Sequence, residues 1–219
     1  MAYQLTDAEK RAVLALFDKQ CEVWQKRGFP RAYSKSEMNF FSEEIRPLRG
    51  VLAQYLKDGK VPPPGNPDVI PILLVMSSQK IGFQRQYDLY GFKKYLSYID
   101  LGEVENAEDP FTEPYVLVNV TPGKTWTGFS PDVAEVLIST NGGFNCNFEE
   151  GLAAMKFIDE NWKAYHWNYE VMLCGARHKG IFVPYIDFAN ASGPVIKSSP
   201  PDAASSCRGP LSYEDVIKF

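Results

Sequence analysis

Residues 57–67 read KDGKVPPPGNP and divide the chain into two parts that differ in hydrophobic period. Five of the six positions from 62 to 67 are glycine or proline, and such a cluster interrupts helices and strands alike. Before this segment, apolar residues recur every three or four positions, whereas after it they form short continuous runs. The segment therefore predicts a joint between a helical region at 1–61 and a strand-containing body at 68–219, which we expect to pack as one continuous domain.

The region before the joint carries the signals of two helices. Thr6 and Glu9 have the spacing of a capping box, in which each side chain binds the backbone N–H of the other residue. Ser34 and Glu37 repeat that spacing, and Pro47 predicts a kink or a split in the second helix. The first helix should bury a face whose members are spaced by three or four residues: Val13, Leu16, Phe17, Gln20, Cys21 and Trp24.

The body contains apolar runs that are typical of buried strands. Residues 69–76 and 115–120 are two such runs, each bounded by turn residues. Residues 171–174 and 181–188 predict a strand pair around a turn at 177–180. Residues 123–125, Gly-Lys-Thr, lack the first glycine of a phosphate-binding loop and so predict a plain hairpin turn.

Helix signals are interspersed with these strands. Ser130 before Pro131 predicts a helix start, with Val133, Val136 and Leu137 facing inward. Asn147 and Glu150 predict the capped start of another helix. Because helices and strands mix without a regular βαβ period, the sequence predicts an α+β fold. We expect an N-terminal helical segment packed on a mixed β-sheet body with two or three further helices.

Composition limits the classes of partner. The 219 residues include 23 Lys and Arg against 27 Asp and Glu, a net charge of −4. Residues 1–68 hold 11 basic and 9 acidic side chains, net +2, so the remainder holds 12 and 18, net −6. Duplex-binding proteins normally show a basic excess, so nucleic-acid binding is disfavoured.

Sequence features also bear on location and cofactors. The longest apolar run, residues 69–76, is far shorter than the roughly 20 residues of a membrane span. The N-terminus lacks the pattern of a signal peptide, which predicts a cytoplasmic protein with reduced thiols. The four cysteines form no C-x-x-C pair, and with two histidines no complete metal motif is present, so we expect no metal and no cofactor.

Two arginines lead the first functional hypothesis. Arg177 and His178 lie in the predicted turn, where an imidazole would be exposed and able to titrate. Cys207 and Arg208 lie in residues 197–213, a segment with three prolines and five serines. Guanidinium groups bind carboxylate or phosphate through paired hydrogen bonds. These four residues predict a non-catalytic protein that binds an anionic small molecule or a peptide in an arginine-lined pocket.

Two alternatives remain open. A hydrolase or acyl-transfer enzyme would use Cys207 or Cys174 as nucleophile and His178 as base, with Asp187 or Glu150 orienting the base. No spacing ties these residues together, so no catalytic residue is assigned. Self-association through apolar surface on the N-terminal helices, at Phe40 and Phe41, is the other alternative.

The chain also resembles a bacterial family known only as a domain of unknown function. The resemblance runs along nearly the whole chain, and its carriers are FDKQ at 17–20, GFP at 28–30, Pro47-Leu48, PYVLVNV at 114–120, NFEEGLA at 147–153, GAR at 175–177, Val183-Pro184 and SCRG at 206–209. It implies that Arg177 and the Cys207-Arg208 pair recur together in related chains. Where the family's turn often carries Arg-Cys, this chain has Arg177-His178. The resemblance implies no known activity.

Overall fold

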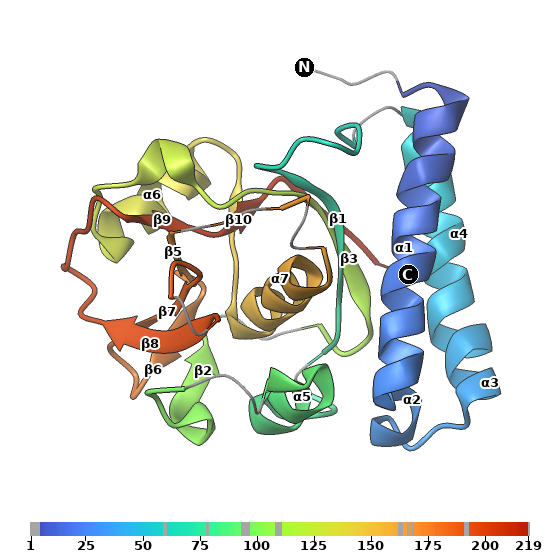
Figure 1. The fold of residues 1–219 in the computed structure, drawn as a ribbon, viewed down its shortest axis with the longest axis horizontal. Coiled ribbons are helices and arrows are strands. Elements are labelled where there is room, and N and C mark those ends of the chain that lie inside the picture. The colour runs from blue at the N-terminus through green and yellow to red at the C-terminus, as the bar shows by residue number, and fades with distance from the viewer. Residues whose placement is uncertain are drawn as a thin grey trace.

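The computed structural model of the chain describes residues 5–58, 61–77, 79–92, 97–107, 111–161, 164–165, 167, 169–190 and 193–218. The fold is α+β, as predicted: N-terminal helices pack side by side against a body of small sheets and further helices (Figure 1). The helices are α1 (Asp7–Arg27), α2 (Phe29–Ala32), α3 (Glu37–Phe40), α4 (Arg46–Tyr55), α5 (Phe83–Tyr90), α6 (Pro131–Thr140) and α7 (Phe148–Glu160). The strands are β1 (Ile70–Val75), β2 (Val104–Asn106), β3 (Tyr115–Val120), β4 (Phe144–Asn145), β5 (Glu170–Met172), β6 (Ala176–His178), β7 (Val183–Asp187), β8 (Val195–Ser199), β9 (Arg208–Pro210), β10 (Ser212–Tyr213) and β11 (Asp215–Ile217).

Helix α1 binds the edge of the body's central sheet through a polar side chain, Gln20. Its capping box at Thr6 and Glu9 is present as predicted, and Val13, Phe17, Cys21 and Trp24 are buried. Gln20 lies on the same face and binds the backbone of β1. Its Oε1 accepts from the Leu74 N–H at 2.9 Å, and its Nε2 donates to the Ile72 carbonyl at 3.3 Å. Strand β1 lies at the edge of its sheet, and Gln20 supplies hydrogen-bond partners for backbone groups on its unpaired side.

The second helical stretch differs from prediction at its start and agrees at its split. The N-cap is Ser36, whose Oγ accepts from the Asn39 N–H at 3.2 Å, whereas Ser34 has a left-handed backbone with φ of 56°. A π-helical turn at Phe41–Ile45 separates α3 from α4, and Pro47 lies in the first turn of α4. Pro47 is tolerated there because the first N–H groups of a helix have no intrahelical acceptor.

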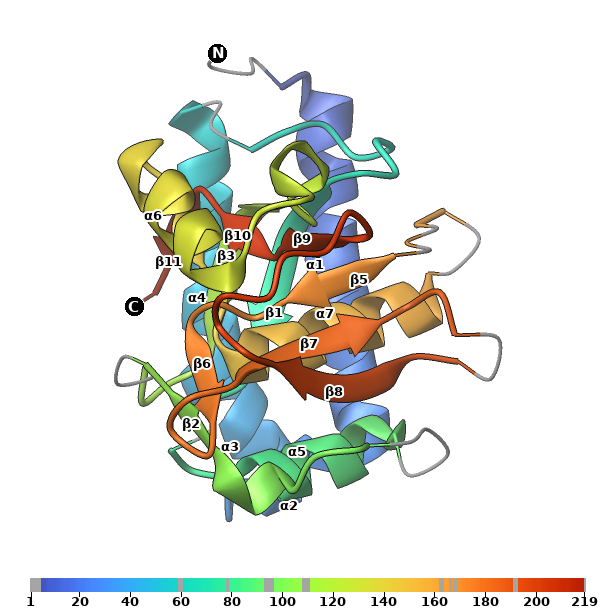
Figure 2. The same cartoon turned by 90° about the vertical axis from the view of Figure 1, so that its left-hand side faces the viewer.

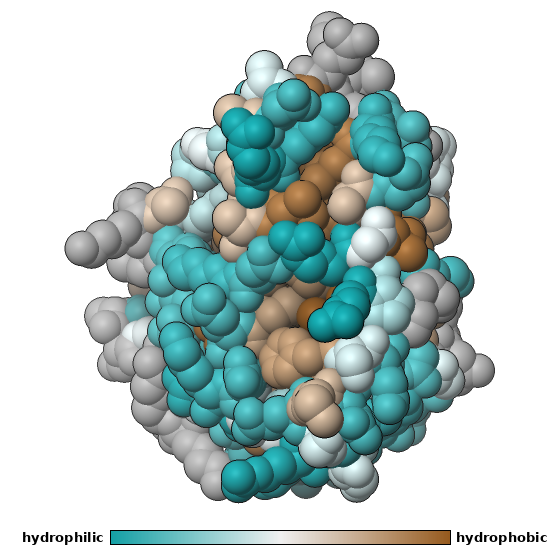
Figure 3. All heavy atoms as spheres, turned by 90° about the vertical axis from the view of Figure 1, so that its right-hand side faces the viewer, coloured by the Kyte–Doolittle hydropathy of each residue, from teal (hydrophilic) through white to brown (hydrophobic). Residues whose placement is uncertain are grey.

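The apolar surface of these helices differs from the one predicted. Phe40 is fully buried and Phe41 is partly buried against the core, so the expectation of exposed apolar surface at these two positions is wrong. Phe40 packs edge-on against Tyr33, with ring centroids 5.4 Å apart. Figure 3 shows instead a narrow apolar strip on the outer face of the helices, bordered by polar residues on both sides.

The central sheet has the order β1-β3-β11 and is antiparallel throughout. Every residue of β1 and β3 is buried, because α1 and α4 cover one face and α7 covers the other (Figure 1). Burial on both faces explains why these strands are continuous apolar runs and not alternating ones.

A second sheet has the order β8-β7-β5-β9, in which only β5 and β9 are parallel. Figure 2 shows this sheet in front of α7. Val171, Ile186 and Ile196 are buried on its inner side, where they join the main core. Register places Tyr185 and Arg208 on the opposite, outer face. This face combines charged side chains with a small apolar cluster that includes Tyr185 and Ala134 of α6.

The predicted strand pair is present as β5 and β7, but the connection between them is longer than the predicted turn at 177–180. Residues 176–178 form β6, which leaves the four-stranded sheet and pairs with β2. His178 is opposite Val104 in that pair and also bonds through its backbone to Phe182. Consequently His178 is 7% exposed, and the expectation of an exposed imidazole is wrong.

Two further expectations for the body need correction. Val133 and Val136 of α6 are 45% and 65% exposed, whereas Pro131, Ala134 and Ile138 are buried, because α6 packs this other side on the outer face of the second sheet.

Gly123 does not make the predicted hairpin turn. It has φ of 62°, and a Cβ there would lie 2.2 Å from the Pro210 carbonyl oxygen, so glycine is required for the approach of β9.

Other predictions for the body are confirmed or lie outside the described residues. The capping box of Asn147 and Glu150 starts α7. His166, the other of the two histidines, lies outside the described residues. Within the described ranges, no helix combines the length and the apolar character that crossing a membrane requires.

Candidate ligand-binding site

The structure gives both predicted binding arginines internal partners. Arg177 donates to the Cys174 carbonyl at 2.7 Å and to Glu135 Oε2 at 2.9 Å. Arg208 donates to Glu170 Oε2 at 2.8 Å and to Ser199 Oγ at 2.8 Å. Both guanidinium groups are therefore engaged within the protein, Arg177 against α6 and Arg208 on the outer face of the second sheet.

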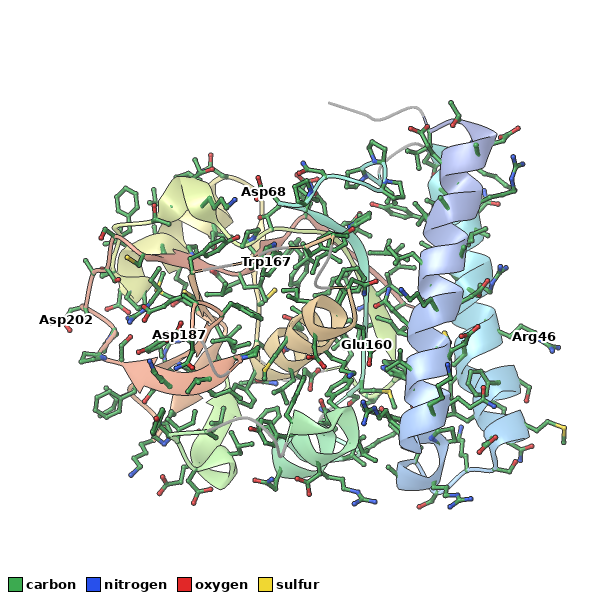
Figure 4. All side chains as sticks on the ribbon, in the orientation of Figure 1. Arg46, Asp68, Glu160, Trp167, Asp187 and Asp202 are labelled. Atoms are coloured by element: carbon green, nitrogen blue, oxygen red, sulfur yellow. The ribbon has the colours of Figure 1, made fainter. Side chains whose placement is uncertain are left out.

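Arg208 also stacks on an aromatic ring. Its guanidinium carbon lies 3.8 Å from the centroid of Tyr185, and the residue is 8% exposed. Next to it on the same face, Asp187 accepts from Lys197 Nζ at 2.9 Å (Asp187 is labelled in Figure 4). Through these contacts the polar side chains of this face bind one another, which indicates a structural role.

The residues predicted for cysteine and histidine chemistry are not brought together. Cys174 is buried beneath α6 and its Sγ faces the Pro131 carbonyl oxygen at 3.8 Å. Burial raises the pKa of this thiol to about 12, so it is protonated at neutral pH. Cys207 is exposed, and its Sγ lies 3.9 Å from Ser206 Oγ. His178 Nδ1 instead faces Ser198 Oγ at 3.1 Å.

The second nitrogen of His178 faces an acid. Nε2 lies 3.5 Å from Glu103 Oε2 and is buried without a hydrogen-bond partner. Glu103 also pairs with Lys179 at 3.2 Å. Among the described residues, neither candidate thiol hydrogen-bonds to His178, and Asp187 is paired elsewhere, so the geometry assembles no triad.

A polar cavity lies elsewhere, between α6, the β4–β10 pair and the first turn of α7. Figure 2 shows α6 beside β10. The pocket has a volume of about 170 Å³. Its described lining consists of polar, aromatic and small residues from segments far apart in sequence: Ala107, Phe111, Glu135, Ser139, Gly143, Phe144, Asn145, Asn147, Glu150, Gly175 and Tyr213.

Local structure explains how these segments meet. The β4–β10 pair places Tyr213 opposite Phe144, and their rings stack with centroids 5.3 Å apart. Gly175 faces the backbone of β4, and a Cβ there would lie 2.9 Å from the carbonyl oxygens of Asn145 and Cys146. The pocket wall thus depends on a close backbone approach that only glycine permits.

Glu150 lies at the inner wall, and its surroundings favour its protonated form. The Asn147 N–H donates to its Oε2 at 2.7 Å. Tyr115 Oη lies 3.1 Å from its Oε1 and also 2.8 Å from Glu149 Oε1. The phenol has one hydrogen and can donate it to one of these two carboxylate oxygens. The contact with the other oxygen is then a hydrogen bond only if a carboxyl group carries a proton. Burial, followed by the charge of Glu149, raises the pKa of Glu150 to about 8.

An acceptor at the same pocket lacks a partner. Asn145 Nδ2 donates to the Glu135 carbonyl at 3.2 Å, which fixes the orientation of the amide. Its Oδ1 is buried and has no hydrogen-bond partner. Leaving such a group unpaired costs about 1–3 kcal/mol, which a ligand N–H or O–H would recover. Arg177 contributes indirectly, because it holds the Glu135 carboxylate at the wall.

A second crevice, between α1 and α7, is less suited to a ligand. Its lining includes Leu16, Trp24, Lys156, Phe157 and Glu160 (Glu160 is labelled in Figure 4). The volume is only about 30 Å³, close to the share of one water molecule in the liquid. Lys156 is already paired with Glu160 at 2.6 Å.

No protein-family model, curated protein or solved structure matches the chain. The resemblance to the uncharacterised bacterial family therefore stays a prediction. The described part of the chain holds no group of three or more His, Cys, Asp or Glu side chains placed to bind a metal ion. The site must accordingly be interpreted from its own geometry.

Sequence reasoning found Asn147 and Glu150 through their capping spacing but missed the strand residues of the pocket. Phe144, Asn145 and Tyr213 belong to strands of two residues each, which are too short to show a hydrophobic period. The available signal was the Asn-Gly-Gly turn before Phe144, which marks a chain reversal but not its partner.

Proposed function

We propose that this protein is a non-catalytic ligand-binding protein whose ligand occupies the pocket between α6, the β4–β10 pair and the start of α7. The observation that carries the proposal is the buried Asn145 Oδ1, an acceptor without a partner at the wall of a polar cavity. Buried polar atoms are nearly always hydrogen-bonded, and exceptions often mark functional positions. A small polar molecule that donates a hydrogen bond would complete this site.

The proposal keeps the binding class predicted from the sequence but changes the residues. Arg177 and Arg208 have internal partners, so neither supplies a free guanidinium to a ligand. Glu135, Asn145, Glu150 and the aromatic pair take their place. The cysteine and histidine enzyme is less favoured, because its residues lie apart and the Cys174 thiol is held protonated.

Ligand screening by protein-observed NMR tests the proposal. A library of small polar compounds should include ligands that shift the amide signals of Phe144, Asn145, Gly175 and Tyr213. Asn145→Leu removes the unpaired acceptor at similar size and should weaken those ligands about tenfold, the equivalent of one hydrogen bond. Asn161→Leu, in the small crevice between α1 and α7, is the matched control and should leave them unchanged.

Two results would contradict the proposal. Ligands that respond to Asn161→Leu but not to Asn145→Leu would place binding in the other crevice. A library without any compound that shifts the pocket signals would remove the basis for a binding site there.

Location and self-association extend this proposal. All four cysteines are free thiols, which supports a cytoplasmic, reducing environment. Met38 and Val51 are 78% and 38% exposed on the N-terminal helices, so self-association through these helices would use these positions and not Phe40. Sedimentation velocity of Val51→Glu against the unmodified protein tests the self-association.

A further inference from the structure

We propose that the ligand of this pocket is a small organic cation, an alkylammonium group held between the carboxyl groups of Glu135 and Glu150 and the stacked rings of Phe144 and Tyr213. This inference rests on the proposed function and adds the chemical class of the ligand. It reverses the charge of the ligand that the two arginines suggested.

The charge of the lining supports a cation. Two glutamates contribute to the pocket wall, and the described lining residues include no lysine or arginine. Arg177 neutralises Glu135 from behind through one oxygen, Oε2, and the Glu135 side chain remains 39% exposed. Asn145 Oδ1 adds an unpaired acceptor. An ammonium group donates hydrogen bonds only and so complements these acceptors, whereas a carboxylate ligand would meet the negative charge of Glu135.

The aromatic rings complement the alkyl part and the charge. Phe144 is 50% exposed although its ring stacks on Tyr213, with an interplanar angle of 19°. Exposed aromatic faces attract ammonium groups, because the face of the ring carries negative potential. Lys218 Nζ makes a contact of this kind elsewhere in the chain, 4.5 Å from the ring centroid of Phe111.

Glu150 links binding to proton release. In the free protein its carboxyl group keeps a proton, since burial raises its pKa to about 8. A cation beside it favours the carboxylate, so Glu150–COOH and the ammonium ion give the carboxylate–ammonium pair and one proton to solvent. Affinity should therefore increase as pH rises toward about 8 and then level off. Alkylammonium ions resemble lysine, with a pKa of about 10.4, and stay charged over this range.

The experiment compares three probes with similar alkyl chains: butylammonium chloride, 1-butanol and sodium pentanoate. Each is titrated into the full chain, with binding followed from the NMR shifts of Phe144, Asn145 and Tyr213. We expect butylammonium to bind at least about tenfold more tightly than 1-butanol, and pentanoate to give no saturable shift. Glu150→Gln keeps the capping geometry and should lower butylammonium affinity at pH 8 severalfold and abolish its pH dependence.

Controls separate electrostatic from structural effects. Glu150→Gln should leave the affinity of 1-butanol unchanged, whereas a merely structural role would weaken both probes. Phe144→Leu should weaken butylammonium more than 1-butanol, because leucine keeps apolar contact but lacks a π face. The exposed variant Glu22→Gln on α1 should change nothing.

Each outcome decides between the two proposals. Equal or tighter binding of 1-butanol at the pocket would overturn the cation and leave the binding function intact. Saturable binding of pentanoate would also overturn the cation and restore an anionic ligand. No shift from any of the three probes would overturn the cation, while the library screen described above would independently decide whether the pocket binds ligands at all.

Discussion

Two regions of the molecule bury ionisable side chains and satisfy them in opposite ways. On the outer face of the second sheet, Arg208 is bound by Glu170 and Ser199 and covered by the ring of Tyr185. At the start of α7, Glu149 and Glu150 are both buried and both contact one phenol, Tyr115. The first region pairs opposite charges, whereas the second sets two acids side by side.

This difference separates a structural group from a functional one. A buried charge with a counter-charge and complete hydrogen bonds has no capacity left for a ligand. Two adjacent buried acids must share protons, and a proton can be exchanged for a cation. Of the residues singled out in the sequence, Arg208 was expected to bind a ligand and Glu150 only to orient a base. The structure instead favours a structural role for Arg208 and a ligand-binding role for Glu150.

The largest effect is expected from breaking the first region. Arg208→Met removes the guanidinium and leaves Glu170 partly buried without its counter-charge. We expect a loss of about 3–5 kcal/mol in the free energy of unfolding, measured by urea denaturation. The double variant with Arg208→Met and Glu170→Met leaves no carboxylate unpaired. Its free energy of unfolding should therefore fall by less than that of the single variant. Equal losses would mean that packing on Tyr185, and not the ion pair, stabilises this face.

The second region should show itself in the pH dependence of stability. The pKa of Glu150 is raised from 4.5 to about 8, so the folded protein holds a proton that the unfolded chain releases. Its stabilising contribution is complete below about pH 4.5 and is lost as pH rises to about 8. Relative to the unmodified protein, Glu150→Gln should gain roughly 1.4 kcal/mol per pH unit in this window.

Denaturation series at several pH values measure this gain. Between about pH 5.5 and 7.5 it amounts to roughly 3 kcal/mol. Glu22→Gln, at an exposed position, serves as the control and should run parallel to the unmodified protein. A constant difference between Glu150→Gln and the unmodified protein would show that Glu150 is ionised in the fold.

A neutral, partly buried group offers an intermediate case. Gln20 satisfies the Leu74 N–H and the Ile72 carbonyl without any charge. Gln20→Leu should cost about 2 kcal/mol, because both backbone groups are buried and lose their partner. Thermal denaturation measures the loss, and Gln25→Leu on the exposed side of α1 is the matched control. A neutral result for Gln20→Leu would mean that water replaces the amide at the edge of β1.

The smallest effect is expected at the rim of the first region. Lys197 pairs with Asp187 at 2.9 Å, but its side chain is 30% exposed. Lys197→Ala should therefore cost less than about 1 kcal/mol, and the cost should shrink further in high salt. A loss as large as that of Arg208→Met would show that the whole face acts as one network.

Sequence reasoning succeeded where the signal is local or continuous. The capping boxes at Thr6 and Asn147, the split at Pro47 and the runs that became β1 and β3 all depend on residues close together in the chain. It failed where a distant contact decides the outcome. The N-cap is Ser36 and not Ser34, and the residue of α6 that faces inward is Ala134 and not Val133. In both cases packing partners decide which residues of the helix face the core.

The candidate site was harder to predict for the same reason. Glu150 could be singled out from its spacing, but its neighbours at the pocket come from segments that meet only after folding. His178 shows the limit clearly: a turn-like sequence became a buried strand because β2, some 70 residues earlier in the chain, pairs with it. Two-residue strands such as β4 and β10 carry no period from which either partner could be inferred.

The placement of β9, β10 and β11 bears on how the chain folds as it is synthesised. Residues 208–217 supply one strand each to three sheets, whose other strands all lie earlier in the chain. A nascent chain would therefore expose the edges of β3, β4 and β5 until this short segment leaves the ribosome. The completion of three sheets thus depends on these ten residues. A stop codon before residue 208 would leave all three sheets with unpaired edges, which chaperones or proteases would recognise.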